Sequence, residues 1–175
     1  MRIGIVTGAS SGLGWAYAKE IDKTMELDEI WLIARREARL RKLASELRAR
    51  GRVLELDLTR RESFDALREL LQAERPQIEI LAVNAGFGKY GRAEDMTAEE
   101  THDMIALNCW GAAETTRMCI PCMGRGSRVL EIASCAAFQP LPGMNLYAAT
   151  KAFVLQYARA LRRELAHRGV NTNRP

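Results

Sequence analysis

Tyr147 and Lys151 are the pair of residues in this sequence whose types and spacing best suit acid–base chemistry. They lie four positions apart, so a helix that begins near Tyr147 and runs to about Leu165 would place the phenol and the ammonium on one face. A tyrosine ordinarily titrates at about pH 10, and a fixed cation about 5 Å away favours the phenolate by roughly 3 kcal/mol at an effective dielectric of about 20. Proton transfer at neutral pH needs a shift of about that size. The same spacing also arises by chance in ordinary helices, so the pair needs support from the rest of the chain.

The elements that must position this pair are strands and helices that alternate along the chain. Apolar runs predict strands at residues 2–7, 29–34, 52–57, 78–84 and 128–133, with helical stretches between them. This pattern predicts an α/β fold, a parallel sheet with helices on both faces, built as a single domain over residues 1–175.

The turn after the first strand is rich in glycine. It reads Gly8, Ala9, Ser10, Ser11, Gly12, Leu13, Gly14 and leads into a helical stretch that ends at about Lys23. Glycines allow the backbone to approach a ligand closely, and the start of a helix favours a phosphate group. The spacing Gly-x-x-x-Gly-x-Gly differs from the Gly-x-Gly-x-x-Gly fingerprint of dinucleotide-binding proteins, and glycines also serve plain tight turns.

Arg35 and Arg36 follow the second predicted strand, about 20 residues beyond the glycine turn. An acidic residue here would bind the ribose hydroxyls of NAD, whereas arginine accommodates the 2′-phosphate of NADP. We therefore predict NADP as the cofactor, with NAD as the alternative. The two arginines could instead simply begin a basic helix.

Small and polar residues follow the other predicted strands, at the edge where open α/β sheets bind ligands. Asp57 and Leu58 end the third strand, Asn84, Ala85 and Gly86 end the fourth, and Ser134 ends the fifth.

Two four-residue stretches have the pattern of a capping box and predict helix starts, at residues 59–62 and 97–100. The second would open a long helix towards Pro121 that carries Asn108 amid apolar neighbours. Asn108 either bonds a neighbouring backbone group or serves a site.

A cluster of basic residues between Arg35 and Arg52 raises the possibility of nucleic-acid binding, although the net charge is only +4. The acidic residues Glu37 and Glu46 and a stripe of leucines indicate an amphipathic helix with a solvated basic face instead. We predict no nucleic-acid partner.

Cys119 and Cys122 have the spacing of a redox or zinc motif, but no second Cys or His pair accompanies them. We expect no metal site, and we expect these thiols to pack at a helix end stopped by Pro121. The sequence shows no export signal and no apolar run long enough to span a bilayer. A cytoplasmic protein with reduced thiols and no membrane partner is therefore expected.

Taken together, these short motifs resemble those of the short-chain dehydrogenase/reductase family, over residues 2 to about 169. The matching positions are Thr7, Gly8, Gly12 and Gly14 after the first strand, Asp57 after the third, Asn84, Ala85 and Gly86 after the fourth, Asn108 in the fifth helix, Ser134 after the fifth strand, and Tyr147 with Lys151.

The resemblance implies a doubly wound, Rossmann-type sheet in three α/β/α layers. It also implies hydride transfer between NADP(H) and a small-molecule carbonyl or alcohol. Tyr147 would be the proton donor in reduction and the base in oxidation, and Lys151 would favour the phenolate and bind the nicotinamide ribose. Ser134 would bind the substrate oxygen, and Asn108 would keep a helix distortion and a water of the proton relay. Asp57 and Leu58 would lie at the adenine, and residues 84–86 along the cofactor.

The sequence departs from the family pattern at its end. Members continue through further strands and a loop that covers the substrate, whereas here Val170 is followed by five polar or proline residues. We expect a fold that is incomplete at the C-terminus, with strand five as an unpaired edge. Apolar residues of the Tyr147 helix would then lack cover, namely Phe153, Val154, Leu155, Tyr157 and Leu161. This predicts a homodimer or higher homo-oligomer. It also leaves open a non-catalytic NADP-binding module as the alternative function.

Overall fold

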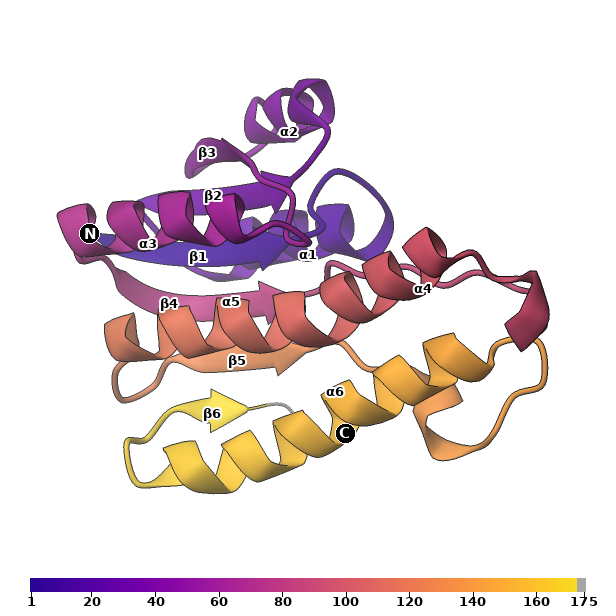
Figure 1. Cartoon of the computed structure of the whole chain (residues 1–175). Helices are drawn as coiled ribbons and strands as arrows, with labels where there is room; N and C mark the ends of the chain where they lie inside the picture. The colour runs from indigo at the N-terminus through magenta and orange to yellow at the C-terminus, as the bar shows by residue number, and fades with distance from the viewer. Residues whose placement is uncertain (173–175) are drawn as a thin grey trace.

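Strand β1 (Arg2–Thr7) lies in the middle of a six-stranded parallel sheet in the computed structural model, which describes residues 1–172 (Figure 1). The other strands are β2 (Glu29–Ala34), β3 (Arg50–Glu55), β4 (Gln77–Val83), β5 (Arg128–Glu131) and β6 (Asn171–Thr172). Their order is β3-β2-β1-β4-β5-β6, so the direction of winding reverses between β1 and β4. This is the doubly wound arrangement that the sequence predicted.

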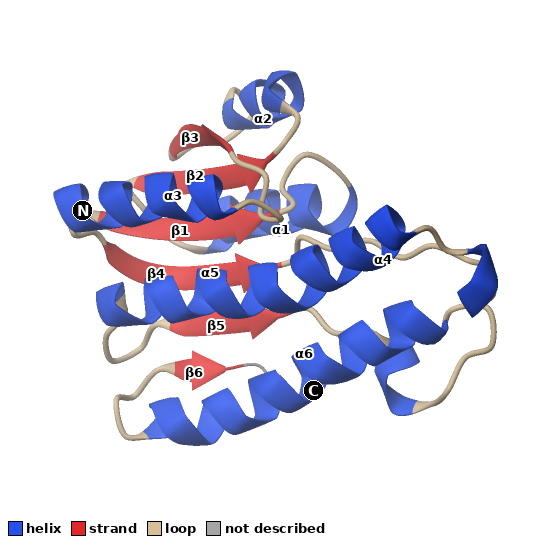
Figure 2. Ribbon diagram, in the orientation of Figure 1, coloured by secondary structure: helices blue, strands red, loops and turns tan. Residues whose placement is uncertain are grey.

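Helices cover both faces of the sheet, which makes three layers (Figure 2). The longer helices are α1 (Gly12–Thr24), α2 (Glu37–Ala44), α3 (Arg61–Glu74), α4 (Ala98–Ile105), α5 (Ala112–Cys119) and α6 (Asn145–Ala166). Short helices lie at Ala93–Asp95, Ala106–Gly111, Ile120–Cys122 and Cys135–Phe138. Helices α1 and α2 lie on one face, and α3, α5 and α6 lie on the other (Figure 1).

The central strands are apolar along their length because both of their faces are covered. Ile3 and Ile5 of β1 pack into the cluster beneath α3, α5 and α6, whereas Val6 packs beneath α1 and α2. Each of these three side chains is fully buried.

Three strands end earlier than the sequence predicted. β3 is Arg50–Glu55 rather than 52–57, β4 ends at Val83 rather than at residue 84, and β5 ends at Glu131 rather than at residue 133. The residues that follow leave the ladder at the carboxyl edge of the sheet, where they line a cavity described below. The residues directly after β3 and β5 are apolar, and each still donates its N–H to the neighbouring strand: Leu56 to Ala34 at 3.2 Å and Ile132 to Val83 at 3.1 Å.

One of the two predicted capping boxes is correct. Thr97 Oγ1 accepts the N–H of Glu100 at 3.1 Å, and Glu100 Oε2 accepts the N–H of Thr97 at 3.0 Å. The predicted box at residues 59–62 is wrong. Thr59 instead donates its N–H and its hydroxyl to Asp57 Oδ1, at 3.0 and 2.7 Å, and α3 begins at Arg61 without a side-chain cap.

The expectation that strand five is an unpaired edge is also wrong. Asn171 and Thr172 form β6, which pairs in parallel with Arg128 and Val129. Backbone pairing beside an existing strand outweighs the low strand propensity of asparagine. Residues 173–175 lie outside the described part of the chain.

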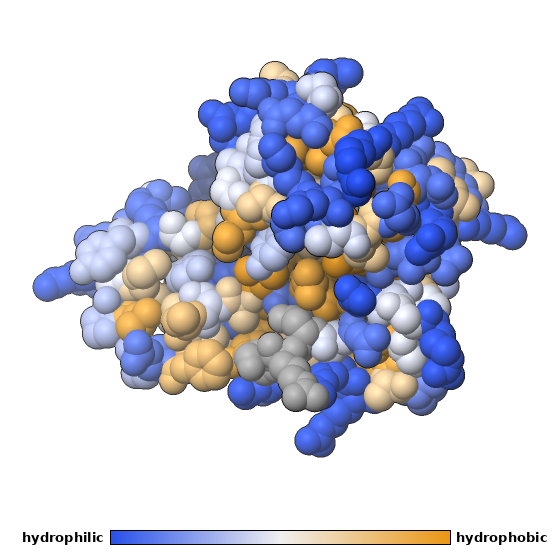
Figure 3. All heavy atoms as spheres, turned by 180° about the vertical axis from the view of Figure 1, so that it is seen from behind, coloured by the Kyte–Doolittle hydropathy of each residue, from blue (hydrophilic) through white to orange (hydrophobic). Residues whose placement is uncertain are grey.

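Much of the expected exposure on α6 is absent. Val154, Leu155 and Leu161 are buried, whereas Phe153 remains 43% exposed and stacks on Tyr157. Seen from behind, on the side of α1 and α2, apolar side chains gather in the middle and lower part of the surface (Figure 3). Uncovered apolar surface therefore lies at Phe153 and on the rear face, rather than along the whole of α6.

Candidate active site

A cavity of about 490 Å³ opens at the carboxyl edge of the sheet, where β1 and β4 diverge. Fourteen of the predicted site residues line it, from the arginines after β2 to the start of α6. They are Gly8, Ser10, Ser11, Gly12, Leu13, Arg35, Arg36, Asp57, Leu58, Asn84, Ala85, Gly86, Tyr147 and Lys151.

The glycine turn brings the backbone close to β4 and leaves room for a ligand. Gly8 has φ +67°, and a Cβ atom there would lie 2.9 Å from the Cα of Ala85. Gly12 has φ +56° with open space on its Cβ side, and it begins α1, whose first turn has no acidic residue. A diphosphate fits this site because free N–H groups and the positive end of the helix dipole face the cavity.

Gly14 does not line the cavity. A Cβ atom at this position would meet the carbonyl oxygen of Gly8 at 2.3 Å, so the third glycine allows α1 to pack against the turn. Thr7 joins the two central strands, because its Oγ1 accepts the N–H groups of Asn84 and Ala85 at 2.9 Å each.

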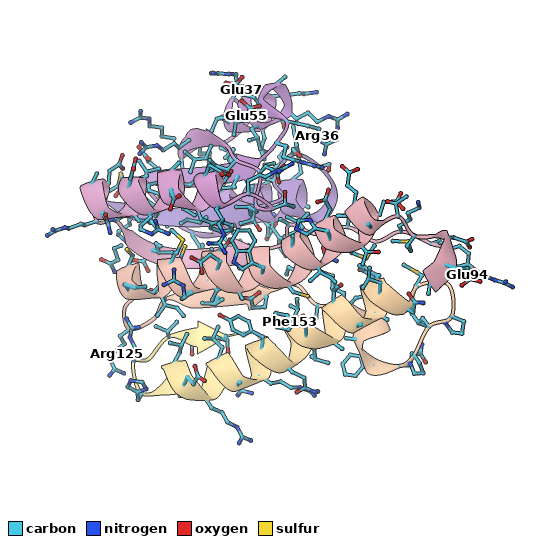
Figure 4. The ribbon with its side chains drawn as sticks, viewed as in Figure 1. Arg36, Glu37, Glu55, Glu94, Arg125 and Phe153 are labelled. Carbon is cyan, nitrogen blue, oxygen red and sulfur yellow. The ribbon has the colours of Figure 1, made fainter. Side chains whose placement is uncertain are left out.

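Arg36 closes the opposite end of the cavity from Tyr147. Its guanidinium donates to Ser10 Oγ at 2.9 and 3.1 Å and to Ser11 Oγ at 2.6 Å. Figure 4 labels Arg36 at the beginning of α2, beside the loop that precedes α1. A fixed guanidinium next to two serine hydroxyls is a suitable site for a phosphate monoester.

Asp57 stays ionised at the cavity wall. Burial opposes its ionisation, but the hydrogen bonds from Thr59 and the charges of Arg35 and Arg60 outweigh burial and lower the pKa of Asp57. The carboxylate can therefore accept hydrogen bonds from a ligand at neutral pH.

Tyr147 and Lys151 lie on the same face of α6, as their spacing predicted. Lys151 Nζ is 5.9 Å from the centroid of the Tyr147 ring, and it donates to the carbonyl oxygen of Ile132 at 2.7 Å. Lys151 is only 6% exposed, and burial lowers its pKa, while the nearby Glu131 and Cys109 oppose this shift.

Asn108 lies in a π-helical segment, Ala106–Gly111, between α4 and α5. Its Nδ2 donates to the Phe87 carbonyl at 2.8 Å and to Thr150 Oγ1 at 3.0 Å, and its Oδ1 accepts the Phe87 N–H at 3.0 Å. Asn108 is buried and joins the loop after β4 to α6, but it does not line the cavity.

Ser134 lies outside the cavity lining as well. Its Oγ accepts the N–H of Ala136 at 3.1 Å and caps the short helix Cys135–Phe138. Of the four predicted catalytic residues, the structure thus brings Tyr147 and Lys151 into the cavity and leaves Asn108 and Ser134 beside it.

Several cavity residues were missed by the sequence analysis. They are Ile33, Ala34, Leu56, Phe87, Gly88, Leu107, Ile132 and Ala133. Most of them directly precede or follow a predicted site residue, so counting the neighbours of each predicted site residue would have found them. Gly88 is the most informative, since a Cβ atom there would lie 2.7 Å from the Tyr147 ring.

Cys119 is buried at the end of α5, and burial raises the pKa of its thiol. Cys122 follows in the short helix Ile120–Cys122, as expected for a packing role. Within residues 1–172, no group of three or more His, Cys, Asp or Glu side chains is placed to hold a metal ion. No helix in the same range is both long and apolar enough to cross a membrane.

The sheet order and the cavity at its carboxyl edge define a Rossmann-type α/β protein. A family model described as short chain dehydrogenase matches residues 2–174, and the chain belongs to this family of oxidoreductases. By this resemblance it is an enzyme of the short-chain dehydrogenase type.

Two curated relatives illustrate the similarity. An uncharacterized oxidoreductase of Staphylococcus epidermidis is 29% identical over 171 residues, which are 97% of this chain and 74% of the relative. Sulfoacetaldehyde reductase 2 of Chromohalobacter salexigens is 33% identical, over 95% of this chain and 68% of the relative.

Solved structures give the same result. A short-chain dehydrogenase from Streptomyces avermitilis superposes with a TM-score of 0.87 at 30% identity, over 98% of this chain. The match covers 63% of that protein, so this chain spans less than two thirds of its length. A short-chain dehydrogenase from Sphingobium yanoikuyae in complex with NADPH has a TM-score of 0.84 at 33% identity, over 97% of this chain and 68% of that one.

Proposed function

We propose that this protein transfers a hydride between NADP(H) and a small carbonyl or alcohol substrate. The observation that carries the proposal is the composition of one cavity. Arg36, bonded to two serine hydroxyls, lies at one end, and Tyr147 with Lys151 lies at the other. A dinucleotide with a 2′-phosphate has matching groups at its two ends.

The residues of the chain would divide the work as follows. Arg36 and Ser10 bind the 2′-phosphate, the α1 N-terminus binds the diphosphate, and Asp57 accepts a hydrogen bond at the adenine. When bound, the nicotinamide supplies or accepts the hydride. Tyr147 donates its phenolic proton to the carbonyl oxygen in reduction and takes it back in oxidation. Lys151 holds the phenol and the ribose hydroxyls in place.

The substrate class follows from the residues near Tyr147. Phe87 and Gly88 form an apolar wall beside the phenol, which suits a carbonyl compound with an apolar body. The relatives support a carbonyl as the reacting group, since one is named a sulfoacetaldehyde reductase and a structural neighbour from Comamonas testosteroni a bulky-bulky ketone specific alcohol dehydrogenase.

A non-catalytic NADP-binding module is the second candidate. The position of Ser134 favours it, because its hydroxyl accepts the N–H of Ala136 and does not line the cavity. In this alternative the chain binds NADP(H) but lacks the hydroxyl that would hold a substrate oxygen.

Two measurements separate the candidates. The first is a calorimetric titration of the protein with NADPH and with NADH. The second tests a panel of aldehydes and ketones as substrates of the wild type and of Tyr147→Phe, with turnover measured as the loss of NADPH absorbance. Turnover that Tyr147→Phe abolishes supports the oxidoreductase, and tight NADPH binding without any turnover supports the binding module. A chain that binds neither cofactor contradicts both.

We also propose that the chain forms a homo-oligomer and acts in the cytoplasm. The exposed side chains of Phe138 and Phe153 support self-association, because each leaves a large aromatic surface in water. Light scattering that gave a clean monomer at high concentration would contradict it.

A further inference from the structure

A buried carboxylate lies on β5, one residue before the carbonyl group that binds Lys151. Glu131 is the last residue of β5 and is 1% exposed. Its Oε1 accepts a hydrogen bond from Thr116 Oγ1 of α5 at 2.5 Å. The side chain of Glu131 therefore points into the layer between the sheet and the helices α5 and α6. A carboxylate in such a layer is costly, so it calls for a functional explanation.

Lys151 enters the same layer from α6. Its Nζ donates to the carbonyl oxygen of Ile132, the residue that follows Glu131, at 2.7 Å. Helices α5 and α6 cover the same face of the sheet (Figure 1), so the layer that receives the Glu131 side chain from β5 also receives the Lys151 side chain from α6. Each charge stabilises the other against burial.

We propose that Glu131 is a positioning residue for Lys151: its carboxylate, one residue from the carbonyl oxygen that Lys151 binds, holds the charged Lys151 side chain inside the cavity. The use of that ammonium in proton transfer rests on the function proposed above, whereas the interaction between the two charges is independent of that function.

In the described part of the chain, a tyrosine and two thiols also face Glu131 or Lys151. Tyr157 faces Glu131 from α6, and burial, together with the charge of Glu131, raises its pKa to about 12. Cys119 faces Glu131 from α5, and Cys109 faces Lys151 from the π-helical segment. Burial raises the pKa of both thiols. Among these groups, Glu131 and Lys151 are the two that carry opposite charges.

The pH range of the effect follows from the two pKa shifts. Burial raises the pKa of Glu131 to about 7, although Thr116 and Lys151 oppose this shift. Above that pH the carboxylate is ionised, and its charge raises the pKa of Lys151 against the effect of burial. Lys151 then keeps its proton over an alkaline range in which a buried lysine alone would lose it.

Glu131→Gln removes the charge but keeps an oxygen that can accept the Thr116 hydroxyl. The probe is protein with ¹³C at the ε-carbon of lysine, with the Lys151 signal assigned by its absence in Lys151→Arg. We expect the titration midpoint of Lys151 to lie at lower pH in Glu131→Gln than in the wild type, because the charge that favours the ammonium is gone. Glu55→Gln is the matched control, since Glu55 ends β3 as Glu131 ends β5 but is exposed (Figure 4).

Equal titration midpoints in wild type and Glu131→Gln would overturn the inference. If circular dichroism shows that Glu131→Gln does not fold, the test uses the wild type alone, with ¹³C also at the side-chain carboxyl of glutamate. The Lys151 signal should then change at the pH at which the Glu131 carboxyl ionises, and a Lys151 signal that does not change there overturns the inference.

The titration needs no turnover, which separates this inference from the proposed function. A shifted midpoint in a chain without activity supports the coupling and contradicts the enzyme. Activity with no shift contradicts the coupling alone. Where turnover is found, the alkaline limb of kcat/KM should move to lower pH in Glu131→Gln and stay unchanged in Glu55→Gln.

Discussion

Asn108 binds both backbone groups of Phe87, accepting its N–H at 3.0 Å and donating to its carbonyl at 2.8 Å. The two residues are 21 positions apart, and the pair fixes the loop that follows β4 against the π-helical segment. A third bond, to Thr150 Oγ1 at 3.0 Å, extends the connection to the helix that carries Tyr147.

Asn108→Ala should therefore destabilise the fold as well as the site. It leaves the partly buried backbone groups of Phe87 and the buried Thr150 hydroxyl without their partner, which costs about 3 kcal/mol in the free energy of unfolding. Urea denaturation measures this loss. Gln72→Ala on the exposed side of α3 also removes an amide side chain and should change the free energy by less than about 0.5 kcal/mol. Similar losses in the two variants would contradict the role given to Asn108.

Arg36→Ala should weaken NADPH binding without a comparable effect on NADH. A hydrogen-bonded contact between guanidinium and phosphate contributes about 1.5–3 kcal/mol, so the NADPH Kd should rise by roughly 10- to 100-fold. Arg41→Ala is the control, because Arg41 lies on the same helix, is exposed, and pairs with Glu37. Calorimetry on the wild type and the two variants, each with NADPH and with NADH, gives the six affinities. An equal loss for NADH and NADPH would show that Arg36 does not select the cofactor.

Most of the cavity could be predicted from the sequence because parallel strands all end at one edge. Residues after β1, β2, β3 and β4 must therefore meet there, whatever the details of packing. The partner of Asn108 could not be predicted, since the sequence indicates a buried amide in a helix but not which distant backbone group it binds. Glu131 was missed for a similar reason. Its position at the end of an apolar strand gives no sign of Thr116, 15 residues away, which makes the burial of the carboxylate possible.

Gly88→Ala should displace the phenol of Tyr147. A Cβ atom at position 88 would lie 2.7 Å from the ring, closer than van der Waals contact allows, so either the ring or the loop must move. A shift of about 1 Å in a reacting group can cost about 100-fold in rate, so kcat should fall by a factor of that order while NADPH binding is retained. In the same loop, Gly91→Ala meets its nearest atom at 3.8 Å and should leave both quantities unchanged. A normal kcat in Gly88→Ala would contradict this packing.

The four thiols should react with iodoacetamide in an order set by exposure. Cys135 is exposed and should be alkylated first, whereas Cys119 is fully buried and should react only after unfolding. Burial also raises the pKa of Cys119, which reduces its thiolate fraction further. Mass spectrometry of native and denatured samples gives the order. Early alkylation of Cys119 in the native protein would contradict its packing role at the end of α5.

Glu131 should make the folded state less stable as the pH rises from about 4.5 to about 7. Its carboxyl has a usual pKa of 4.5, and burial raises the pKa in the folded protein to about 7. Between these values the folded state holds a proton that the unfolded state has released, so stability falls with increasing pH and is constant above about 7. The full loss is about 3 kcal/mol, because each pKa unit corresponds to about 1.4 kcal/mol.

Glu131→Gln should remove this dependence. Urea denaturation should show the variant as stable as the wild type below about pH 4.5 and more stable above about pH 7. Glu55→Gln, at an exposed strand end, should follow the wild type at every pH. A wild-type stability that rose between these two pH values relative to Glu131→Gln would mean that the carboxylate is stabilised by its surroundings. A gain in stability on losing Glu131 is the expected sign of a residue kept for its charge next to Lys151 rather than for the fold.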